Sequence, residues 1–364
     1  MCEGIKNFLN EHLFLTALEQ VLMCKNYDID LPPVMERFPS DFIERSRIDV
    51  LTNKDEEEFG EKGSFQGRKG RQMDEDTVEF ERLPNGNYRI TRVADLSGKD
   101  SFPEDRVSYF REDYGMNSHH YNWHRINIDG TTPRRDDYFI YNHEQMLARY
   151  NAERLANGLP RVEPYSDMRR PVEVGHEANL GHDNRQFADR PDNAIPAEYA
   201  RIGDFERKRR SLDRTIQQEV INDEAFFDAL ESYHDAGHMI LAQTVEDERH
   251  RGDRNVMQDS PVSARDNVFF RWHQHVQDLF DQYEGMKRRV TESYLTYEDL
   301  VVPHFGVWDM VVTSHRGTRR ANELITGCSY HTMEATSGLD FKGNERAYVH
   351  MTHLDHVPFT YHID

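Results

Sequence analysis

The chain has 364 residues and a formal net charge of −21, with 37% hydrophobic and 30% charged residues. This length allows two or three domains with a sizeable core, and 20 Phe and 17 Tyr exclude wholesale disorder. The excess of negative charge excludes nucleic acid and anionic membranes as expected partners, because such polyanions would be repelled.

Cysteine usage and the N-terminus predict where the protein resides. The three cysteines, Cys2, Cys24 and Cys328, are scattered, which predicts no disulfide framework and is typical of a reducing compartment. The N-terminus lacks an apolar signal core, and no apolar run is long enough to span a bilayer. We therefore expect a soluble, cytoplasmic protein.

The first hundred residues predict helices followed by strands. Apolar residues between 7 and 25 recur at helical spacing, and a shorter helix is predicted over 39–51. Residues 55–76 are rich in charge and poor in apolar side chains, which predicts a surface loop or linker. The Asn-Gly-Asn run at 85–87 predicts a tight turn between two short strands.

Two histidine pairs are the most informative motif. His120 and His124 stand four residues apart, as do His234 and His238, so each pair shares one face of a helix. That spacing lets two imidazoles reach a single metal ion. Ser118 is predicted to cap the helix that carries the first pair.

A further histidine follows each pair inside an aromatic-rich helix. His143 lies in a helix predicted from about 136 to Gly158, and His273 in one predicted over 264–283. Asn222 is predicted to cap the helix of the second pair. One isolated pair is more often two solvated or core histidines, but two pairs with distal histidines favour a metal centre inside a helical bundle.

The remaining histidines favour ordinary roles. His176 and His182 lie in a segment rich in Pro, Gly, Asn and Asp that is predicted to wrap the surface, and His275 is predicted to be solvated. Beyond residue 292 the pattern predicts strands at 299–303, 308–312 and 348–354. The histidines of the last segment alternate, which favours strand positions over a metal-binding cluster.

Several longer motifs carry a resemblance to a known family. They are EHLFLTALEQ at 11–20, LPPV at 31–34, YGMNSHH at 114–120, MLARYNAERL at 146–155, ARDNVFFRWH at 264–273 and THLDHVPFTY at 352–361. With these motifs the chain resembles the arthropod-type hemocyanin and phenoloxidase superfamily, whose site holds two coppers.

The resemblance implies a mainly α fold with a C-terminal β portion. Residues 1–100 would form the helical N-terminal domain with its charged loop, 101–290 a four-helix-bundle metal domain, and 291–364 a truncated β-sandwich-like third domain. Because a sandwich that stops after its first strands leaves edges exposed, we expect either that the remnant packs against the helices or that the natural chain is longer.

The resemblance also assigns ligands. It implies one triad, the A triad, of His120, His124 and His143, and a second, the B triad, of His234, His238 and His273. The chain departs from the family pattern elsewhere. Asn267 replaces a usual proline, Asp235 stands where oxidases often have asparagine, and only the Asp-Ser-Pro run at 259–261 occupies the region where phenoloxidases place a glutamate.

These departures favour a resemblance to the fungal hemocyanin-like cyclopenases. Such enzymes use zinc to convert cyclopenin-type benzodiazepinedione epoxides into viridicatin-type quinolones in alkaloid secondary metabolism. Asp235 would then orient an imidazole or move a proton, or it would be a surface carboxylate. We expect a small aromatic substrate, and a homo-oligomer is compatible with the resemblance. The alternatives are a dicopper, tyrosinase-like phenoloxidase and an oxygen-binding hemocyanin-like protein, since imidazole suits zinc and copper alike.

Overall fold

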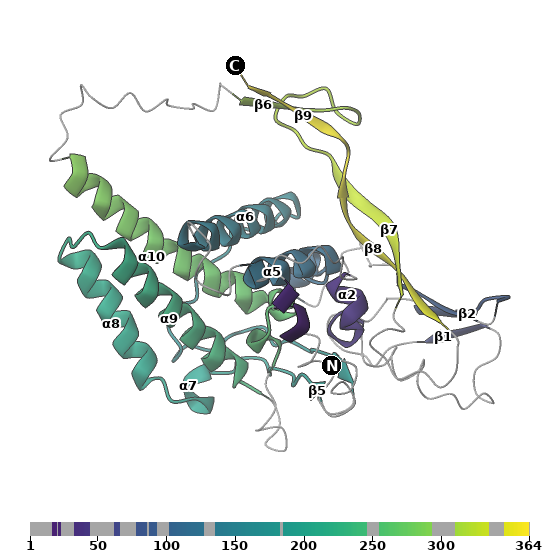
Figure 1. Ribbon diagram of the computed structural model, residues 1–364, viewed down its shortest axis with the longest axis horizontal. Helices are drawn as coiled ribbons and strands as arrows, with labels where there is room; N and C mark the ends of the chain where they lie inside the picture. Colours follow the sequence, from purple (N-terminus) through teal and green to yellow (C-terminus); the bar gives the residue numbers. More distant parts are fainter. Residues whose placement is uncertain are drawn as a thin grey trace.

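The computed structural model describes residues 17–19, 21–22, 33–43, 62–65, 78–85, 87–92, 102–126, 135–182, 185–245, 255–292, 310–334 and 346–363. Helices from the middle of the chain form one body, and a long β-hairpin runs along one side of it (Figure 1). The architecture is therefore mainly α with a C-terminal β portion, as predicted.

The helical elements of the described chain are α2 (Val34–Arg37), η2 (Pro39–Asp41), η3 (Pro103–Val107), α4 (Ser108–Arg111), α5 (Tyr114–Ile126), α6 (Arg135–Ala156), α7 (Pro196–Tyr199), α8 (Gly203–Gln217), α9 (Asp223–Ala242), η5 (Val256–Gln258), η6 (Ser263–Arg265) and α10 (Asn267–Glu292). The strands are β1 (Lys62–Phe65), β2 (Val78–Arg82), β3 (Tyr88–Arg92), β4 (Gly181–His182), β5 (Arg185–Gln186), β6 (Met310–Ser314), β7 (Thr326–Glu334), β8 (Ala347–His356) and β9 (Phe359–Ile363).

The N-terminal predictions are met in part. Within the helix predicted over 7–25, residues 17–19 and 21–22 are helical, and the rest lies outside the described residues. The helix predicted over 39–51 is only the short η2 where it is described. The loop predicted over 55–76 contains β1, which pairs with β2. The turn at 85–87 is confirmed, because β2 and β3 pair in antiparallel orientation across it.

The helices around the histidines start and stop largely where the sequence predicts. Asn222 caps α9 by accepting a hydrogen bond from the amide of Ala225, and Gly158 ends α6 with a φ of +72°. The cap predicted at Ser118 is wrong, because α5 already begins at Tyr114. The carboxylate of Asp113 takes that role and accepts a hydrogen bond from the amide of Met116 at 2.7 Å.

One long helix escaped prediction. In α8 the fully buried side chains are only Phe205 and Leu212, while most other residues are charged. The apolar residues Phe205, Leu212 and Ile216 share one face of the helix, but they are few among many charged residues. The helix predicted over 264–283 begins three residues later and continues to Glu292, because η6 occupies the residues before it.

The main sheet joins segments from both ends of the chain. Its strand order is β1-β2-β3-β8-β7, with β3 and β8 parallel in the register Tyr88↔Ala347. It therefore links the predicted first and third domains, whose boundaries remain a prediction. The strand predicted over 348–354 is confirmed within β8, that over 308–312 overlaps β6, and that over 299–303 lies outside the described residues.

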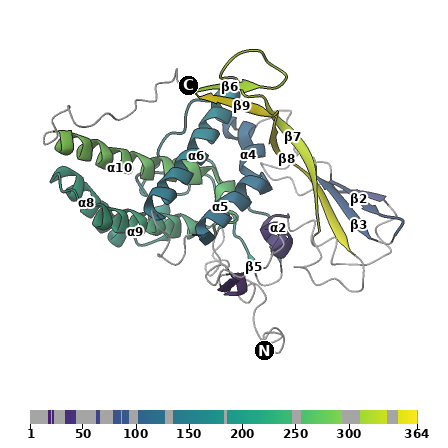
Figure 2. The ribbon, with the colours of Figure 1, turned by 45° about the horizontal axis from the view of Figure 1, so that its top comes forward.

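The long hairpin packs against α5, the helix that carries the first histidine pair. Figure 2 shows α2 between α5 and the sheet. Val34, Tyr121 and Val349 share one buried cluster there, and the amide of Leu354 donates a hydrogen bond to Asp113 at 2.7 Å. The expected packing of the C-terminal strands against the helical body is confirmed.

Stacked aromatic rings hold the helices around the centre of the molecule. Tyr150 of α6 stacks on Phe270 of α10 with ring centroids 3.8 Å apart. Phe226 of α9 stacks on Tyr283 of α10 at 3.7 Å. Burial of each such ring contributes about 1.5–3 kcal/mol. The stacks fix α6 and α9 against α10, the three helices that carry His143, His234 and His273.

Within the described part of the chain, no helix has both the length and the apolar character needed to cross a bilayer.

Two histidines predicted to face solvent are instead buried. His176 is only 3% exposed; its backbone is hydrogen-bonded to that of Arg190, whose buried guanidinium pairs with Asp266 just before α10. The ring of His275 is covered by α8, where Arg209 Nη1 lies 2.7 Å from its Nε2, and the hydroxyl of Tyr233 lies 3.1 Å from the same atom. The side chain of His182 lies outside the described residues.

Candidate metal centre

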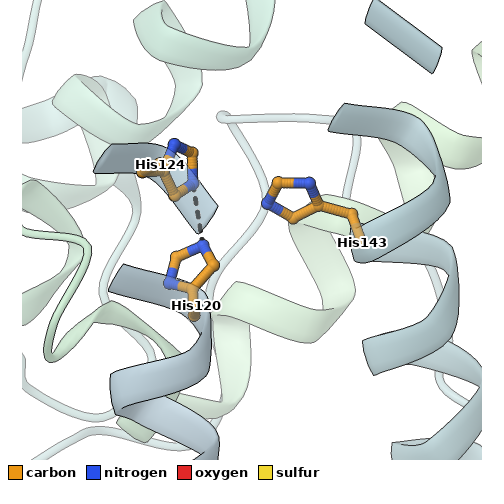
Figure 3. Close-up of side chains that lie close together, drawn as sticks. All are labelled: His120, His124 and His143. Atoms are coloured by element: carbon orange, nitrogen blue, oxygen red, sulfur yellow. Dashed lines mark hydrogen bonds between the residues drawn. The ribbon is translucent and has the colours of Figure 1, made fainter. Parts of the chain in front are cut away.

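The six histidines selected from the sequence converge inside the helical body. Each of two groups has its ligand atoms within 4.8 Å of one another, one formed by His120, His124 and His143, the other by His143, His234 and His273. Figure 3 shows the first group, in which α5 supplies two rings and α6 turns His143 toward them. The first group is the predicted A triad.

The second group differs in one member from the predicted B triad. His238 falls outside it, although its Nε2 lies 3.5 Å from Nε2 of His273. His143 takes its place and belongs to both groups, with its ring stacked on His273 at a centroid distance of 4.5 Å. The two triads are therefore parts of one cluster, and His143 lies at their junction.

Backbone carbonyls fix the orientation of four of these rings. The Nδ1 atoms of His143 and His273 each lie 2.8 Å from the carbonyl oxygen four residues earlier, that of Phe139 and Phe269 respectively. A carbonyl oxygen can only accept, so each Nδ1 carries the proton and each Nε2 keeps its lone pair. These rings are therefore locked in the tautomer that presents Nε2 to a metal.

The loop at 255–262 locks a further ring in each triad. Nδ1 of His120 donates to the carbonyl of Ser260 at 2.8 Å, and Nδ1 of His238 donates to that of Met257 at 2.9 Å. The buried side chain of Asn255 braces this loop, since it accepts from the amide of Met257 at 3.0 Å and donates to two carbonyls at the end of α9. One loop therefore positions a ligand of each triad.

Asp235 contacts the centre from outside. Its side chain is 69% exposed, and its Oδ1 lies 3.0 Å from Nδ1 of His234. Asp235 was expected either to orient an imidazole or to be a surface carboxylate. It is a surface carboxylate that also contacts and orients a candidate ligand. Nδ1 of His234 faces a carboxylate, so its Nε2 also keeps a lone pair.

These tautomers test whether the residues fit a metal. Nε2 of His234 lies 3.1 Å from Nε2 of His273, yet both nitrogens present lone pairs, so no proton is available to join them. Nε2 of His143 is buried and has no hydrogen-bond partner within the described structure. Converging lone pairs in a buried cluster are unfavourable without a cation between them. The donor set therefore fits a metal ion.

The electrostatics of the cluster favour neutral ligands. Burial is the main cause of the lowered pKa at each ring, with the other histidines adding to it. It lowers the pKa of His143 to about 4 and that of His238 to about 3. Imidazoles that remain neutral at physiological pH are ready to coordinate, because a proton does not compete with the metal.

A cavity of about 330 Å³ borders the centre. Three candidate ligands, His124, His143 and His234, line it, together with the aromatic rings of Trp123 and Phe139. This volume lies within the range of small-molecule sites. Dioxygen alone would need far less room, so the cavity has space for an organic substrate beside the metal.

Several residues of the site escaped the sequence analysis. The carbonyls of Met257 and Ser260 have no side-chain signature and could not be found from sequence. Phe139 and Phe269 could have been, because each stands four residues before a candidate ligand in a helix. Their rings lie 4.5 Å and 3.9 Å from those of His143 and His273 and wall the centre on two sides.

Comparison with known proteins identifies the family. The family model for the copper-containing domain of hemocyanin matches residues 33–227. The chain belongs to the hemocyanin family. It is 27% identical to the hemocyanin AA6 chain of Androctonus australis, over 100% of this chain and 59% of that protein. It is also 27% identical to phenoloxidase 2 of Drosophila melanogaster, over 98% of this chain and 54% of that protein.

Solved structures agree on the fold. A crustacean hemolymph-type prophenoloxidase aligns with a TM-score of 0.73 at 22% identity, over 98% of this chain and 59% of that one. An activated-state scorpion hemocyanin aligns with a TM-score of 0.70 at 26% identity, over 97% of this chain and 57% of that one. The chain spans little more than half the length of these relatives.

Proposed function

We propose that this protein is a phenol oxidase in which the six converging histidines hold two copper ions. The observation that carries the proposal is the cluster of buried, tautomer-locked imidazoles beside a cavity large enough for an aromatic ring. The family model describes a copper-containing domain, and a Drosophila phenoloxidase is among the similar proteins. Copper, when bound, would supply dioxygen binding and two-electron redox chemistry.

The protein's own residues would bind and orient the substrate. Trp123 and Phe139 line the cavity and offer aromatic faces to a phenol ring. His124, His143 and His234 also line the cavity, so a phenol oxygen bound beside them would lie next to the metal. In the overall reaction, two catechols lose two electrons and two protons each to one dioxygen, which gives two quinones and two waters.

The zinc cyclopenase expected from the sequence is the second candidate. Asp235, which reaches both the cavity and Nδ1 of His234, is the feature that favours it, because a non-redox ring contraction needs a group that can move a proton. The same imidazoles would hold zinc as a Lewis acid. The relatives support copper better, since they are hemocyanins and phenoloxidases.

Metal content and oxygen dependence separate the two candidates. We expect protein purified without added metal to contain about two copper ions per chain, and to oxidise 4-methylcatechol only in the presence of dioxygen. Protein that holds zinc instead, and converts a benzodiazepinedione epoxide without oxygen in a chelator-sensitive reaction, would overturn the copper proposal.

Variants test the role of the histidines. His143→Ala removes the ring shared by both groups, so we expect loss of both metals and of catechol oxidation. His238→Ala removes one predicted ligand of the B triad and should lower copper content toward one per chain. His356→Ala is the matched control, because this exposed histidine lies on β8 and should leave metal content and oxidation unchanged.

A further inference from the structure

Charged side chains surround the cavity that borders the metal centre. Arg125 from α5, Arg135 and Asp136 from the start of α6, and Glu231 and Asp235 from α9 all line it. Three carboxylates therefore face two guanidinium groups. Whether the cavity favours a cation or an anion depends on how these five charges are already paired.

Both guanidinium groups already have partners. Arg135 forms an ion pair with Glu231 across the cavity. Arg125 donates to the hydroxyl of Tyr121 at 3.0 Å and lies 3.4 Å from the carboxylate of the buried Glu19. Because these partners offset the two positive charges, the carboxylates of Asp136 and Asp235 leave the cavity with an excess of negative charge.

Further carboxylates add to this excess. Burial is the main cause of the raised pKa of Asp136; Arg135 acts to lower this pKa, while Asp228 and Asp137 raise it. Burial likewise raises the pKa of Glu231; Arg135 lowers this pKa, while Asp235 and Asp136 raise it. The two raised pKa values therefore arise mainly from burial, and the acidic neighbours that contribute to them add negative charge beside the cavity.

The inner end of the same cavity offers a different contact. Nε2 of His143 has no hydrogen-bond partner in the described structure, although the residue is only 7% exposed. Asp136 and His143 are seven residues apart on α6, which places them about 10 Å apart along the helix axis. The cavity thus has the candidate metal ligand His143 at one end, aromatic walls, and the carboxylate of Asp136 at the other end. The separation of these two residues along α6 suits a phenol ring with a short aminoalkyl chain.

We propose that this cavity selects phenols that carry a cationic amine on a short side chain, with Asp136 and Glu231 as the residues that determine the preference. This inference rests on the proposed phenol oxidation for the ring-binding end. The preference for a cation rests separately on the charges that line the cavity. Neutral phenols should bind more weakly, and phenols with a carboxylate more weakly still.

Binding of three matched probes tests the preference without turnover. Calorimetric titration of the isolated protein under argon would use tyramine, 4-ethylphenol and 3-(4-hydroxyphenyl)propionate, which share the ring but differ in charge. We expect tyramine to bind about three- to tenfold more tightly than 4-ethylphenol, as one partly screened charge interaction would give. The propionate should bind most weakly, and added salt should reduce the differences.

Charge-neutralising variants locate the preference. Asp136→Asn should bring the affinities for tyramine and 4-ethylphenol to within about twofold, since one carboxylate contributes most of a single charge interaction. Glu231→Gln should favour the propionate, because it frees Arg135 from its ion pair. Asp204→Asn is the control, because it removes the same charge from the exposed face of α8 and should leave the ratio unchanged.

The outcomes distinguish this inference from the proposed function. Equal affinity of the unaltered protein for tyramine and 4-ethylphenol, or no binding of either, overturns the cation preference. An Asp204→Asn variant that loses the preference as fully as Asp136→Asn would also overturn it, because net charge would then be the cause. Tyramine selectivity in copper-loaded protein that oxidises no phenol would instead overturn the proposed oxidase while supporting the cation site.

Discussion

Gly237 permits the close approach of the two helices that carry the second histidine pair and His273. A Cβ atom at this position would lie 2.1 Å from Cζ2 and 2.4 Å from Cε2 of Trp272. The indole is fully buried and packs against Tyr233, so it has no space to move into. Gly237→Ala should therefore force α9 and α10 apart.

The size of the effect follows from these distances. Ordinary van der Waals contact begins at 3.4 Å. The new Cβ would lie only 2.1 Å from Cζ2 of Trp272, so the two atoms must move apart by about 1.3 Å, the difference between these distances. Overpacking of this kind costs about 1–3 kcal/mol, while replacing a helical glycine with alanine contributes about 1 kcal/mol. We expect the difference, a net loss of up to about 2 kcal/mol in the free energy of unfolding.

The metal centre should suffer more than the fold. Nε2 of His234 on α9 and Nε2 of His273 on α10 are 3.1 Å apart, so a shift of this size spoils their joint coordination. We expect metal affinity at this triad to fall by about 10- to 100-fold, comparable with losses of supporting contacts in other metal sites. Copper(I) titration against a chromophoric chelator would measure the loss, and circular dichroism would follow thermal unfolding.

Gly285→Ala provides the matched control on α10. A Cβ at Gly285 would meet only the guanidinium of Arg289, at 3.9 Å, so this variant should gain about 0.5–1 kcal/mol in unfolding free energy and keep its metal affinity. If Gly237→Ala unfolds at a higher temperature than the unaltered protein and binds copper equally well, the helix-separation argument is wrong.

Three further results are expected. Asn255→Ala should loosen the loop that positions His120 and His238 and lower copper affinity in both triads; affinity unchanged in either triad would contradict this. In metal-free protein, the free energy of unfolding should fall as the pH is lowered from about 6.5 to 4, by up to about 1.4 kcal/mol per histidine per pH unit. The reason is that the pKa values of His143 and His238 are lowered in the folded state, so the unfolded chain binds more protons in this range. Equal urea-unfolding free energies at pH 7.5, 6 and 5 would refute this expectation. Asp266→Ala leaves the fully buried guanidinium of Arg190 without its carboxylate partner and should lower the free energy of urea unfolding by about 3–5 kcal/mol.

The histidine cluster was predictable because helical periodicity is a local property. Four-residue spacing placed His120 and His124 on one face of a real helix, and likewise His234 with His238. The distal histidines stood out through their aromatic neighbours. The position of His143 between both groups was not predictable, because it depends on how α6 packs against α10.

The errors have equally specific causes. His275 was assigned to solvent because it stands two residues after His273 and faces away from it, but α8 covers that face. Ser118 looked like a cap, but Asp113 stands earlier and already satisfies the first turn of α5. β7 was missed because most of its residues are exposed, so alternation is absent.

The contact between Asp113 and β8 has a consequence for biosynthesis. Asp113 precedes the helix of His120 and His124, and it accepts a hydrogen bond from Leu354, 241 residues later in the sequence. β3 and β8 are separated by a similar length of chain. Contacts this distant form slowly, because a long loop must close first. During synthesis on the ribosome, the helical body can therefore fold early, while α5 gains its contact with β8 only after that strand emerges. We therefore expect metal loading to follow translation of β8.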